Sequence, residues 1–508
     1  MAVEGASSSF KTQLFINNEY VDAQSGESFP LYNPADESLL HPAIPIAGQA
    51  DVDAAVAGAQ EAFKPTSPWR ASFPAKRRAA AMHKLADLME ANAAELGRLE
   101  TLAMGQPPLV SGLMVRWAAD TFRYYAGWTD KIAGQAFPAE QDEAGDGAPG
   151  TYKIVKYEPI GVCAGVGAWN AAQSTFAWKV APALAAGNTV VYKPSEKAPL
   201  GVLALGALIR EAGFPPGVVQ LVSGPGSTGA LLASHPRVAK ISFTGSAATG
   251  RAIQDAATRS NMKRVTLELG GKSPALVFAD ADLDNAVRQC SLGFLLNSGQ
   301  VCAAASRTLV QEDVAPVFVG RLKAAFEHTA RAMRDPGLEG VHPLQLLGPM
   351  ADRAQFDRVM GFIERAKKEK KTEGGGEGAT LLTGGGRVGD TGLFVEPTIF
   401  VDPEPASEIY TDEIFGPVST VRTFKTEEEA VALANDTSYG LSATLYTNSI
   451  SRALRVSGLL EAGTVGVNTS FTPSPTTPFG GVKQSGSGRE LGLQGLLAYL
   501  DTKTIHIK

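Results

Sequence analysis

The chain has 508 residues, of which 44% are hydrophobic and 19% charged, and its formal net charge is −6. These values are ordinary for a globular protein, and at roughly 150 residues per domain the length predicts two or three domains. A weakly acidic chain lacks the strong positive field that holds nucleic acids or anionic membranes, so neither is expected as a partner.

Three cysteines, Cys163, Cys290 and Cys302, are too few for a disulfide framework in a chain of this length. They indicate a reducing compartment, in which a special cysteine is catalytic rather than structural. The first residues show neither a secretory signal nor a transit peptide, and the charge-free interval 159–178 contains polar residues and several glycines. We therefore expect a cytoplasmic protein without a membrane span. The histidines show no spacing typical of zinc, and no metal is expected.

Short β-branched runs alternate with longer alanine-rich runs, the pattern of an α/β protein with parallel sheets. Amphipathic helices are predicted over 51–63 and 75–102. From residue 162 a βα repeat follows, which predicts a doubly wound nucleotide-binding layer. Its strands are expected at 162–166, 189–192, 218–222, 239–243 and 265–269, with helices at 174–186, 200–212, 229–234 and 251–257. The Gly-rich segments 139–150 and 367–378 are expected to be surface loops. The segment 499–508 is expected to be a solitary strand that pairs either with another subunit or with another part of the sheet.

Four short motifs contain residues suited to chemistry, although each has an ordinary structural reading by itself. Cys302 follows the loop 297–301, and a free cysteine in an apolar stretch is commonly a core residue. Glu268 lies in a strand-like run before Gly270, where a carboxylate is costly unless it is paired or functional. Asn170 follows a buried strand, either as a turn residue or as an amide donor to an oxyanion. The glycine turn 243–250 leads into a helix, which favours phosphate binding, but its Gly-x4-Gly spacing is a weak nucleotide signal.

In combination, these motifs make the chain resemble the aldehyde dehydrogenase superfamily, NAD(P)-dependent enzymes with a catalytic cysteine. The resemblance runs from about Leu14 to the C-terminus. Six motifs in the family's order support it: Lys193-Pro194-Ser195-Glu196, Phe243-Thr244-Gly245-Ser246, Glu268-Leu269-Gly270-Gly271-Lys272, Gly299-Gln300-Val301-Cys302, Glu413-Ile414-Phe415-Gly416-Pro417 and Pro478-Phe479-Gly480-Gly481-Val482-Lys483-Gln484-Ser485-Gly486.

The resemblance implies a role for each matching position. Cys302 would attack the aldehyde carbon, and the Asn170 amide with the Cys302 backbone N–H would stabilise the resulting oxyanion. Glu268 would activate the water that hydrolyses the thioester, with Lys179 and Glu490 nearby to tune or relay its proton, although an ordinary buried ion pair is an equally good interpretation of these two. The implied cofactor residues are Trp169, Lys193, Ser195, Glu196, Gly245, Ser246, Glu413 and Phe415, and the Glu196 carboxylate would favour NAD over NADP.

The chain departs from the family pattern beside Asn170, where Ala168 and Ala171 replace the usual proline and phenylalanine. The smaller side chains remove bulk from the substrate tunnel, unless neighbouring side chains refill the space. Other positions that line the family's substrate entrance are Trp117, Trp178, Phe471 and Phe479. We therefore expect an apolar, aromatic pocket for bulky or aromatic aldehydes.

The implied fold has a Rossmann-like NAD-binding domain (1–138 and 159–270), an α/β catalytic domain (271–484) and a small β oligomerisation element (139–158 and 485–508). A homodimer or homotetramer follows from the resemblance alone. Two alternatives stay open: an acylating enzyme, in which coenzyme A releases the acyl group, and a catalytically silent homologue with a structural role. A base for water favours hydrolysis over the first. A silent homologue would be expected to lack Cys302, Glu268 or Asn170, and all three are present.

Overall fold

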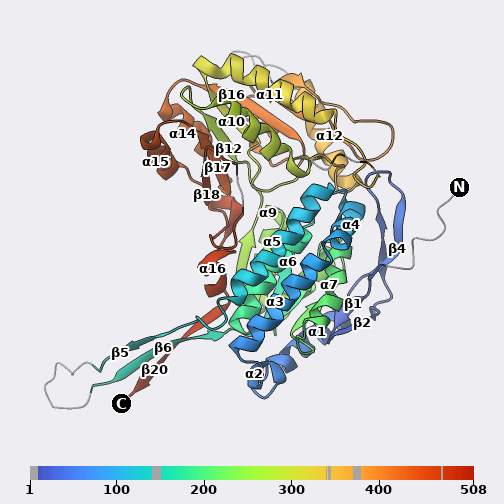
Figure 1. Cartoon of the computed structure of the whole chain (residues 1–508), viewed down its shortest axis with the longest axis vertical. Helices are drawn as coiled ribbons and strands as arrows, with labels where there is room; N and C mark the ends of the chain where they lie inside the picture. Colours follow the sequence, from blue (N-terminus) through green and yellow to red (C-terminus); the bar gives the residue numbers. More distant parts are fainter. Residues whose placement is uncertain are drawn as a thin grey trace.

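The computed structural model describes residues 10–139, 150–338, 340, 342, 345–369, 379–470 and 473–508. Two lobes, each built around a β-sheet, lie one above the other in Figure 1, and a thin arm of strands projects from the lower one. The mixed α/β class predicted from the sequence is confirmed. Within the described ranges, no helix is long and apolar enough to cross a membrane.

An eight-stranded sheet forms the core of the lower lobe, in the order β19-β11-β10-β7-β8-β9-β1-β2. The five strands from β11 to β9 are parallel, and the outer strands pair antiparallel. The chain runs from β7 to β8 on one side and returns to β10 on the other, so a topological switch point lies between β7 and β10, where α/β proteins bind ligands. The strands are β1 Leu14–Ile16, β2 Glu19–Val21, β7 Val162–Val166, β8 Thr189–Lys193, β9 Val219–Leu221, β10 Lys240–Thr244, β11 Arg264–Glu268 and β19 Gly486–Ser487.

Helices cover both faces of this sheet, as the predicted βα repeat requires. One apolar core lies beneath α3 to α7, and a second lies beneath α1, α8 and α9. The helix α6 is buried along its whole length, so its one lysine, Lys179, is also buried. The helices of this lobe are α1 Gln49–Phe63, α2 Pro68–Ala71, α3 Ala75–Ala91, α4 Ala93–Met104, α5 Pro108–Ala126, α6 Ala172–Ala186, α7 Leu200–Glu211, α8 Gly226–Ser234 and α9 Ala247–Ser260.

The single helix predicted over 75–102 is wrong, because the chain breaks it at Asn92. This residue lies between α3 and α4 with φ −105° and ψ 16°. Its side-chain Nδ2 donates to the Leu88 carbonyl oxygen at 2.8 Å. Asparagine competes in this way for backbone groups that a continuing helix would use, and so favours helix ends.

A seven-stranded sheet, in the order β14-β15-β16-β13-β12-β17-β18, forms the upper lobe, and all its strands except β14 are parallel. Its strands are β12 Pro274–Val277, β13 Arg307–Gln311, β14 Thr380–Thr383, β15 Thr398–Val401, β16 Val418–Phe424, β17 Ser442–Tyr446 and β18 Thr464–Val467. Its helices are α10 Leu283–Arg288, α11 Ala315–Ala330, α12 Arg353–Lys368, α13 Glu408–Thr411, α14 Glu427–Asn435 and α15 Ile450–Leu459, with a π-turn at Gln289–Gly293 and short 3₁₀ turns at Leu296–Gly299 and Glu312–Val314.

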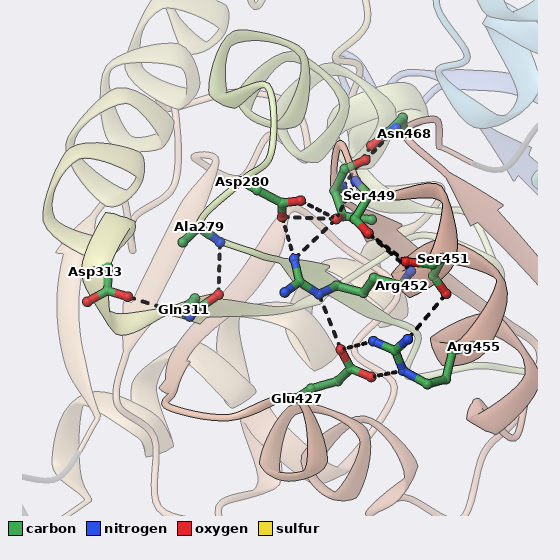
Figure 2. Close-up of polar contacts among 11 residues, drawn as sticks. Ala279, Asp280, Gln311, Asp313, Glu427, Ser449, Ser451, Arg452, Arg455 and Asn468 are labelled. Carbon is green, nitrogen blue, oxygen red and sulfur yellow. Dashed lines mark hydrogen bonds and ion pairs between the residues drawn. The ribbon is translucent and has the colours of Figure 1, made fainter.

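Figure 2 shows a polar network at the carboxyl end of this second sheet. Arg452 on α15 donates to Asp280 at 2.7 Å and to Glu427 at 3.2 Å, and Arg455 binds Glu427 through two nitrogens. Asp280 follows β12, and Glu427 begins α14. The network therefore ties two helices to the sheet. Asn468, directly after β18, also donates to the Thr447 carbonyl at 2.9 Å and fixes the start of the segment that leads back toward the first lobe.

The arm is a three-stranded antiparallel sheet of β5 (Gln135–Phe137), β6 (Tyr152–Pro159) and β20 (Leu500–Ile507). The predicted terminal strand is confirmed, and its partner is β6 of the same chain. The predicted loops fall mostly outside the described residues. The remaining elements are the hairpin β3 (Ser28–Tyr32) and β4 (Leu39–Pro45), a 3₁₀ turn at Lys483–Ser485 and α16 (Gly492–Leu497). The domain boundaries expected from the sequence remain a proposal. The sheets place two short strands on the other side of those boundaries, because β5 belongs to the arm and β19 to the first lobe.

Candidate active site

A cavity of about 870 Å³ runs along the carboxyl edge of the first sheet and ends against residues of the second lobe. It brings together eleven of the predicted site residues: Trp169, Asn170, Lys193, Ser195, Glu196, Gly245, Ser246, Glu268, Cys302, Glu413 and Phe415. Lys179, Glu490, Trp117, Ala171, Trp178 and Phe479 do not line it. Phe471 lies outside the described residues. Motifs far apart in the sequence thus share one cavity at the carboxyl edge of the first sheet, where the switch point lies.

The loop before Cys302 adopts an unusual backbone conformation. Asn297, Ser298 and Gly299 have φ of 54°, 56° and 71°, three left-handed residues in succession. This conformation is costly for residues with a side chain and persists only where the surroundings hold it. It turns the chain from the buried segment after α10 back toward the cavity and so presents the Cys302 side chain at the cavity wall.

Buried side chains of this loop hold it in place. The Gln300 amide donates to the Asn297 and Pro349 carbonyls and accepts from the Ala351 N–H. Ser298 Oγ both donates to and accepts from the Gly348 backbone, at 2.6 and 2.8 Å. Because the loop bonds to the segment 348–351, the position of the Cys302 backbone is fixed by neighbours distant in sequence.

Asn170 lies beside the same loop, after β7. Its Nδ2 donates to the Gln300 carbonyl oxygen at 2.9 Å, and its own carbonyl accepts from Gln106 Nε2 at 2.9 Å. An amide nitrogen carries two hydrogens, so one stays available for a ligand in the cavity. The contacts place an amide donor directly beside the Cys302 loop.

Glu268 is the last residue of β11 and is only 1% exposed. Neither carboxylate oxygen has a hydrogen-bond partner of ordinary geometry among the described residues. Burial raises the pKa of Glu268 to about 8, with a further rise from the Glu490 charge and an opposing effect from Lys179. Such a carboxyl group exchanges protons near neutral pH, as a general base requires.

The surroundings of Cys302 favour its neutral thiol. Loss of water around the sulfur raises its pKa well above the ordinary value, and the negative charges of Glu268 and Glu413 raise it further. The reactive thiolate therefore requires a group that takes its proton. Glu268 is near enough for its charge to affect the thiol, which makes it the candidate acceptor.

Lys179 and Glu490 form a buried ion pair behind Glu268. Lys179 Nζ donates to Glu490 Oε1 at 2.8 Å and to Thr244 Oγ1 at 2.6 Å, and Ser242 Oγ donates to the same Glu490 oxygen at 2.7 Å. The side chains of Lys179 and Glu490 are 1% and 4% exposed. Both charges act on the pKa of Glu268, in opposite directions.

The far end of the cavity has the groups that a dinucleotide needs. The buried Lys193 Nζ lies 3.4 Å from Glu196 Oε2, and burial lowers the pKa of Lys193. Ser246 caps α9 by accepting from the Thr249 N–H, so the N-terminus of a fourteen-residue helix opens into the cavity next to Gly245. A helix N-terminus attracts phosphate through its free N–H groups and its dipole.

Glu413 and Phe415 enter the cavity from the second lobe. Glu413 Oε1 accepts from the Gly271 N–H at 2.9 Å, and a Cβ on Gly270 would lie 2.1 Å from the other Glu413 oxygen. The paired glycines therefore make room for this carboxylate. Burial raises the pKa of Glu413 to about 7, against the hydrogen bond from Gly271. Phe415 makes an edge contact with Trp169, at 5.1 Å between ring centroids.

An apolar cluster lies on the opposite side of Cys302. Trp178 and Phe479 make an edge contact at 5.4 Å and pack together with Leu441, Leu491 and Ala303, against which Cys302 is placed. Ala171 precedes α6 as its N-cap residue. Trp117 lies half-buried on α5. The cluster supplies aromatic surface beside the sulfur.

Lys197, Gln355 and Arg358 are among the cavity-lining residues that the motifs did not indicate. Lys197 Nζ lies 5.3 Å from the Trp169 ring, and Gln355 and Arg358 on α12 donate to the Phe415 and Glu413 carbonyls, both at 2.9 Å. They hold the cofactor-side residues in position. Lys197 could have been found from the sequence, because it directly follows the motif at 193–196. Gln355 and Arg358 could not, because α12 carries no motif.

Comparison with known proteins agrees with this arrangement. The family model described as "Aldehyde dehydrogenase family" matches residues 20–505. Retinal dehydrogenase 2 of Homo sapiens is 44% identical over 500 residues, which cover 98% of this chain and 92% of that protein. The chain belongs to the aldehyde dehydrogenase family. As an enzyme of this family, it oxidises aldehydes to carboxylic acids.

Solved aldehyde dehydrogenase structures share the fold. The indole-3-acetaldehyde dehydrogenase AldA of P. syringae, in complex with NAD+ and IAA, has a TM-score of 0.91 at 36% identity, with 98% of this chain and 97% of that chain covered. An NADP-dependent enzyme of E. coli has a TM-score of 0.90 at 36% identity, with 98% of both chains covered. The fold class and the family resemblance seen in the sequence are therefore confirmed.

Proposed function

We propose that this aldehyde dehydrogenase is an NAD-dependent, hydrolytic enzyme that works through a cysteine thiohemiacetal and a thioester. The observation that supports this proposal is the single cavity that Cys302, Glu268 and Asn170 share with the residues assigned to the cofactor. A nucleophile, a base, an oxyanion donor and a dinucleotide site within one cavity are the parts that this chemistry requires.

Cys302 is the proposed nucleophile. Its thiol transfers its proton to Glu268, and the thiolate attacks the aldehyde carbon to form a thiohemiacetal. Negative charge then develops on the former carbonyl oxygen. The free hydrogen of the Asn170 amide and the Cys302 backbone N–H are the proposed donors to that oxygen, and the Gln300 contact holds Asn170 in place for this role.

Glu268 is the proposed base for the second half of the reaction. Once the proton taken from Cys302 has passed to solvent, Glu268, with a pKa of about 8, is ionised again. It then takes a proton from water, and the hydroxide that forms attacks the thioester and releases the acid and the Cys302 thiolate. The ion pair of Lys179 with Glu490 is proposed to tune this base and to relay its proton. A base in this position favours hydrolysis over transfer of the acyl group to coenzyme A.

The cavity fits a nicotinamide dinucleotide, which when bound supplies the hydride acceptor. Gly245 and Ser246 at the start of α9 are proposed to hold the pyrophosphate, and Lys193 with Glu196 is proposed to bind the adenosine ribose, beside Ser195. The Glu196 carboxylate repels a 2′-phosphate, which favours NAD over NADP. Glu413 is proposed to hold the second ribose, and Phe415 and Trp169 to pack beside it.

The substrate is proposed to be bulky or aromatic. Ala171 leaves room next to Asn170, while Trp178 and Phe479 give an apolar aromatic wall beside Cys302, and Trp117 and Phe471 are proposed to extend it. Two relatives act on large aldehydes according to their names, retinal and indole-3-acetaldehyde. Bulky ligands gain more from apolar burial than acetaldehyde can.

The protein is proposed to form a homodimer or homotetramer and to be cytoplasmic. The arm exposes Phe137, Tyr152 and Ile507, apolar side chains that a homodimer or homotetramer would cover. A cytoplasmic location is supported by a relative named cytosolic in Rattus norvegicus, which is 43% identical.

An aldehyde panel followed by NADH formation, with NAD and NADP in parallel, tests the proposal. We expect NADH and free acid with NAD, and kcat/KM higher for a benzaldehyde-type substrate than for acetaldehyde. Cys302→Ser should abolish the signal, whereas Cys290→Ser, at a buried cysteine outside the cavity, should retain it. An acyl-CoA product, or a tenfold preference for acetaldehyde, would contradict the hydrolytic route or the substrate class respectively.

A further inference from the structure

A stripe of polar side chains lies buried on one face of the first sheet. Lys240, Ser242 and Thr244 alternate along β10, and the parallel register places Thr266 and Glu268 of β11 beside Ser242 and Thr244. All five are 6% exposed or less. The other face of the same two strands carries apolar residues of a hydrophobic core. Because buried sheet faces are normally apolar, a polar stripe of this length calls for a functional explanation.

The stripe connects the candidate active site to a second buried amine. At one end, Glu268 lines the cavity beside Cys302. In the middle, Ser242 and Lys179 both bind Glu490 Oε1, and the other Glu490 oxygen has no partner in the described residues. At the other end lies Lys240, four positions along the strands from Glu268, or about 13 Å.

Lys240 is a buried amine without a counter-ion. Its Nζ donates to the neutral Thr266 hydroxyl and lies 4.9 Å from the centroid of the Tyr499 ring. No carboxylate of the described residues forms an ion pair with it. The titratable groups that affect it are Cys163 on β7, Lys179 on α6, Arg264 on β11, and Glu490 near the C-terminus.

Positive and negative charges along this stripe are equal in number only when Glu268 carries its negative charge. Lys179 is paired with Glu490, which leaves Lys240 as an unpaired positive group and Glu268 as the remaining carboxyl group. In the low-dielectric interior, a charge without a partner is costly, and a second charge of opposite sign on the same stripe lowers that cost.

We propose that Lys240 is a positioning residue for catalysis, whose positive charge acts along this stripe to keep Glu268 in the ionised form that activates water. This inference rests on the proposed role of Glu268. Burial lowers the pKa of Lys240 to about 8, the value that burial also gives Glu268, so the two groups titrate in the same range. A proton lost from Glu268 therefore leaves a carboxylate on the same buried stripe as the Lys240 ammonium group.

The test is the pH dependence of thioester hydrolysis, measured as acid release after the NADH burst between pH 6 and 10. The rate requires ionised Glu268, so in the wild type it rises with pH through about 8. In Lys240→Met the positive charge is gone, Glu268 binds its proton more tightly, and the rise should move upward by about half a pH unit. The plateau rate at high pH should stay within about twofold.

Two further variants distinguish an effect of the Lys240 charge from an effect of side-chain packing. Lys240→Arg keeps the charge and should leave the profile in place. Lys263→Met removes another lysine that is 7% exposed and has a pKa lowered by burial to about 8, but its Nζ contacts Ala233 and Ser260 on α8 and α9, away from the stripe. Its profile should match the wild type.

If Lys240→Met does not fold, Thr266→Val tests the role of the Lys240 charge in its place. The change is nearly isosteric and removes the hydrogen-bond acceptor of the ammonium group, so it should move the profile in the same direction by a smaller amount. Profiles of Lys240→Met and Thr266→Val that both coincide with the wild type would overturn the inference, as would a shift in Lys263→Met of equal size.

A second readout needs no aldehyde. The charge of Glu268 acts on the Cys302 thiol, so the pH profile of Cys302 alkylation by iodoacetamide should move with Lys240→Met as well. If the wild type oxidises no aldehyde of the panel but this alkylation profile shifts, the proposed function fails and the electrostatic role of Lys240 stands. If the wild type is active and neither profile shifts, only the inference fails.

Discussion

Asn170 uses its side-chain amide in two directions. One hydrogen goes to the Gln300 carbonyl oxygen at 2.9 Å, and the other stays available to a ligand in the cavity that Asn170 and Cys302 both line. The Gln106 amide fixes the backbone of Asn170 from behind. A donor held in place before the reaction stabilises a developing oxyanion without the cost of reorganisation.

Asn170→Ala should therefore reduce kcat by about 10²–10³, the usual effect of removing one oxyanion donor, with little change in KM for NAD. Stopped-flow measurement of the NADH burst gives the rate of the affected step. Asn170→Asp keeps the shape but places a negative charge at the oxyanion, and it should reduce the burst at least as much. A burst rate of Asn170→Ala within threefold of the wild type would contradict the assignment.

The sequence indicated the residues that share the cavity more readily than the residues that support them. Cys302, Glu268 and Asn170 lie in recognisable motifs, and the structure brings them to one cavity. Gln355 and Arg358 hold the cofactor-side residues from α12, which has no motif, and only the folded chain shows that its side chains reach the Glu413 and Phe415 carbonyls. Residues that act through tertiary hydrogen bonds leave no local pattern in a sequence.

Elements of the second lobe reach the proposed cofactor site at the sheet edge of the first lobe. The turn after β11 contains Gly270 and Gly271, and the Glu413 carboxylate fills the space that a side chain on Gly270 would need. Gly271 then donates its N–H to the same carboxylate. The pair of glycines thus sets how closely the segment 411–416 approaches the cavity.

Gly270→Ala should displace Glu413 and raise KM for NAD by about tenfold or more, since a hydrogen bond to a charged group contributes about 1.5–3 kcal/mol. Isothermal titration with NAD measures the same loss directly. Gly320→Ala is the matched control, because a Cβ on this glycine of α11 meets nothing within 4 Å. Unchanged NAD affinity in Gly270→Ala would show that Glu413 does not contact the cofactor.

Periodicity predicted elements where the pattern was local. The βα repeat from 162 to 268 was located to within one or two residues at its strands, because buried parallel strands are short apolar runs between amphipathic helices. The helix over 75–102 failed at Asn92, whose side-chain bond to Leu88 ends α3 without any change in the apolar pattern. The strands β1 and β2, the last two on one side of the first sheet, are three residues each and too short for periodicity to detect.

The candidate site is complete only in the folded molecule, because its residues come from distant parts of the chain. The first lobe supplies Glu268 and Asn170, the second supplies Cys302 and Glu413, and the C-terminal segment returns to place Glu490 near Glu268. After that return the chain leaves the body again as β20, which pairs with β6 along eight residues of the arm. The arm and the buried stripe are therefore connected through Tyr499, directly before β20.

The exposed apolar residues of the arm predict the oligomeric state of the protein. Tyr152 and Ile507 are directly paired across β6 and β20 and are 39% and 48% exposed, an apolar pair on a thin sheet with little core of its own. Such a sheet is stable when a partner covers it, so the wild type should be a dimer or tetramer in solution. Replacing both with Asp should shift it toward the monomer by light scattering, whereas Thr502→Asp, at an exposed position of β20, should not. A monomeric wild type would contradict the prediction, and so would a double variant that keeps the wild-type mass.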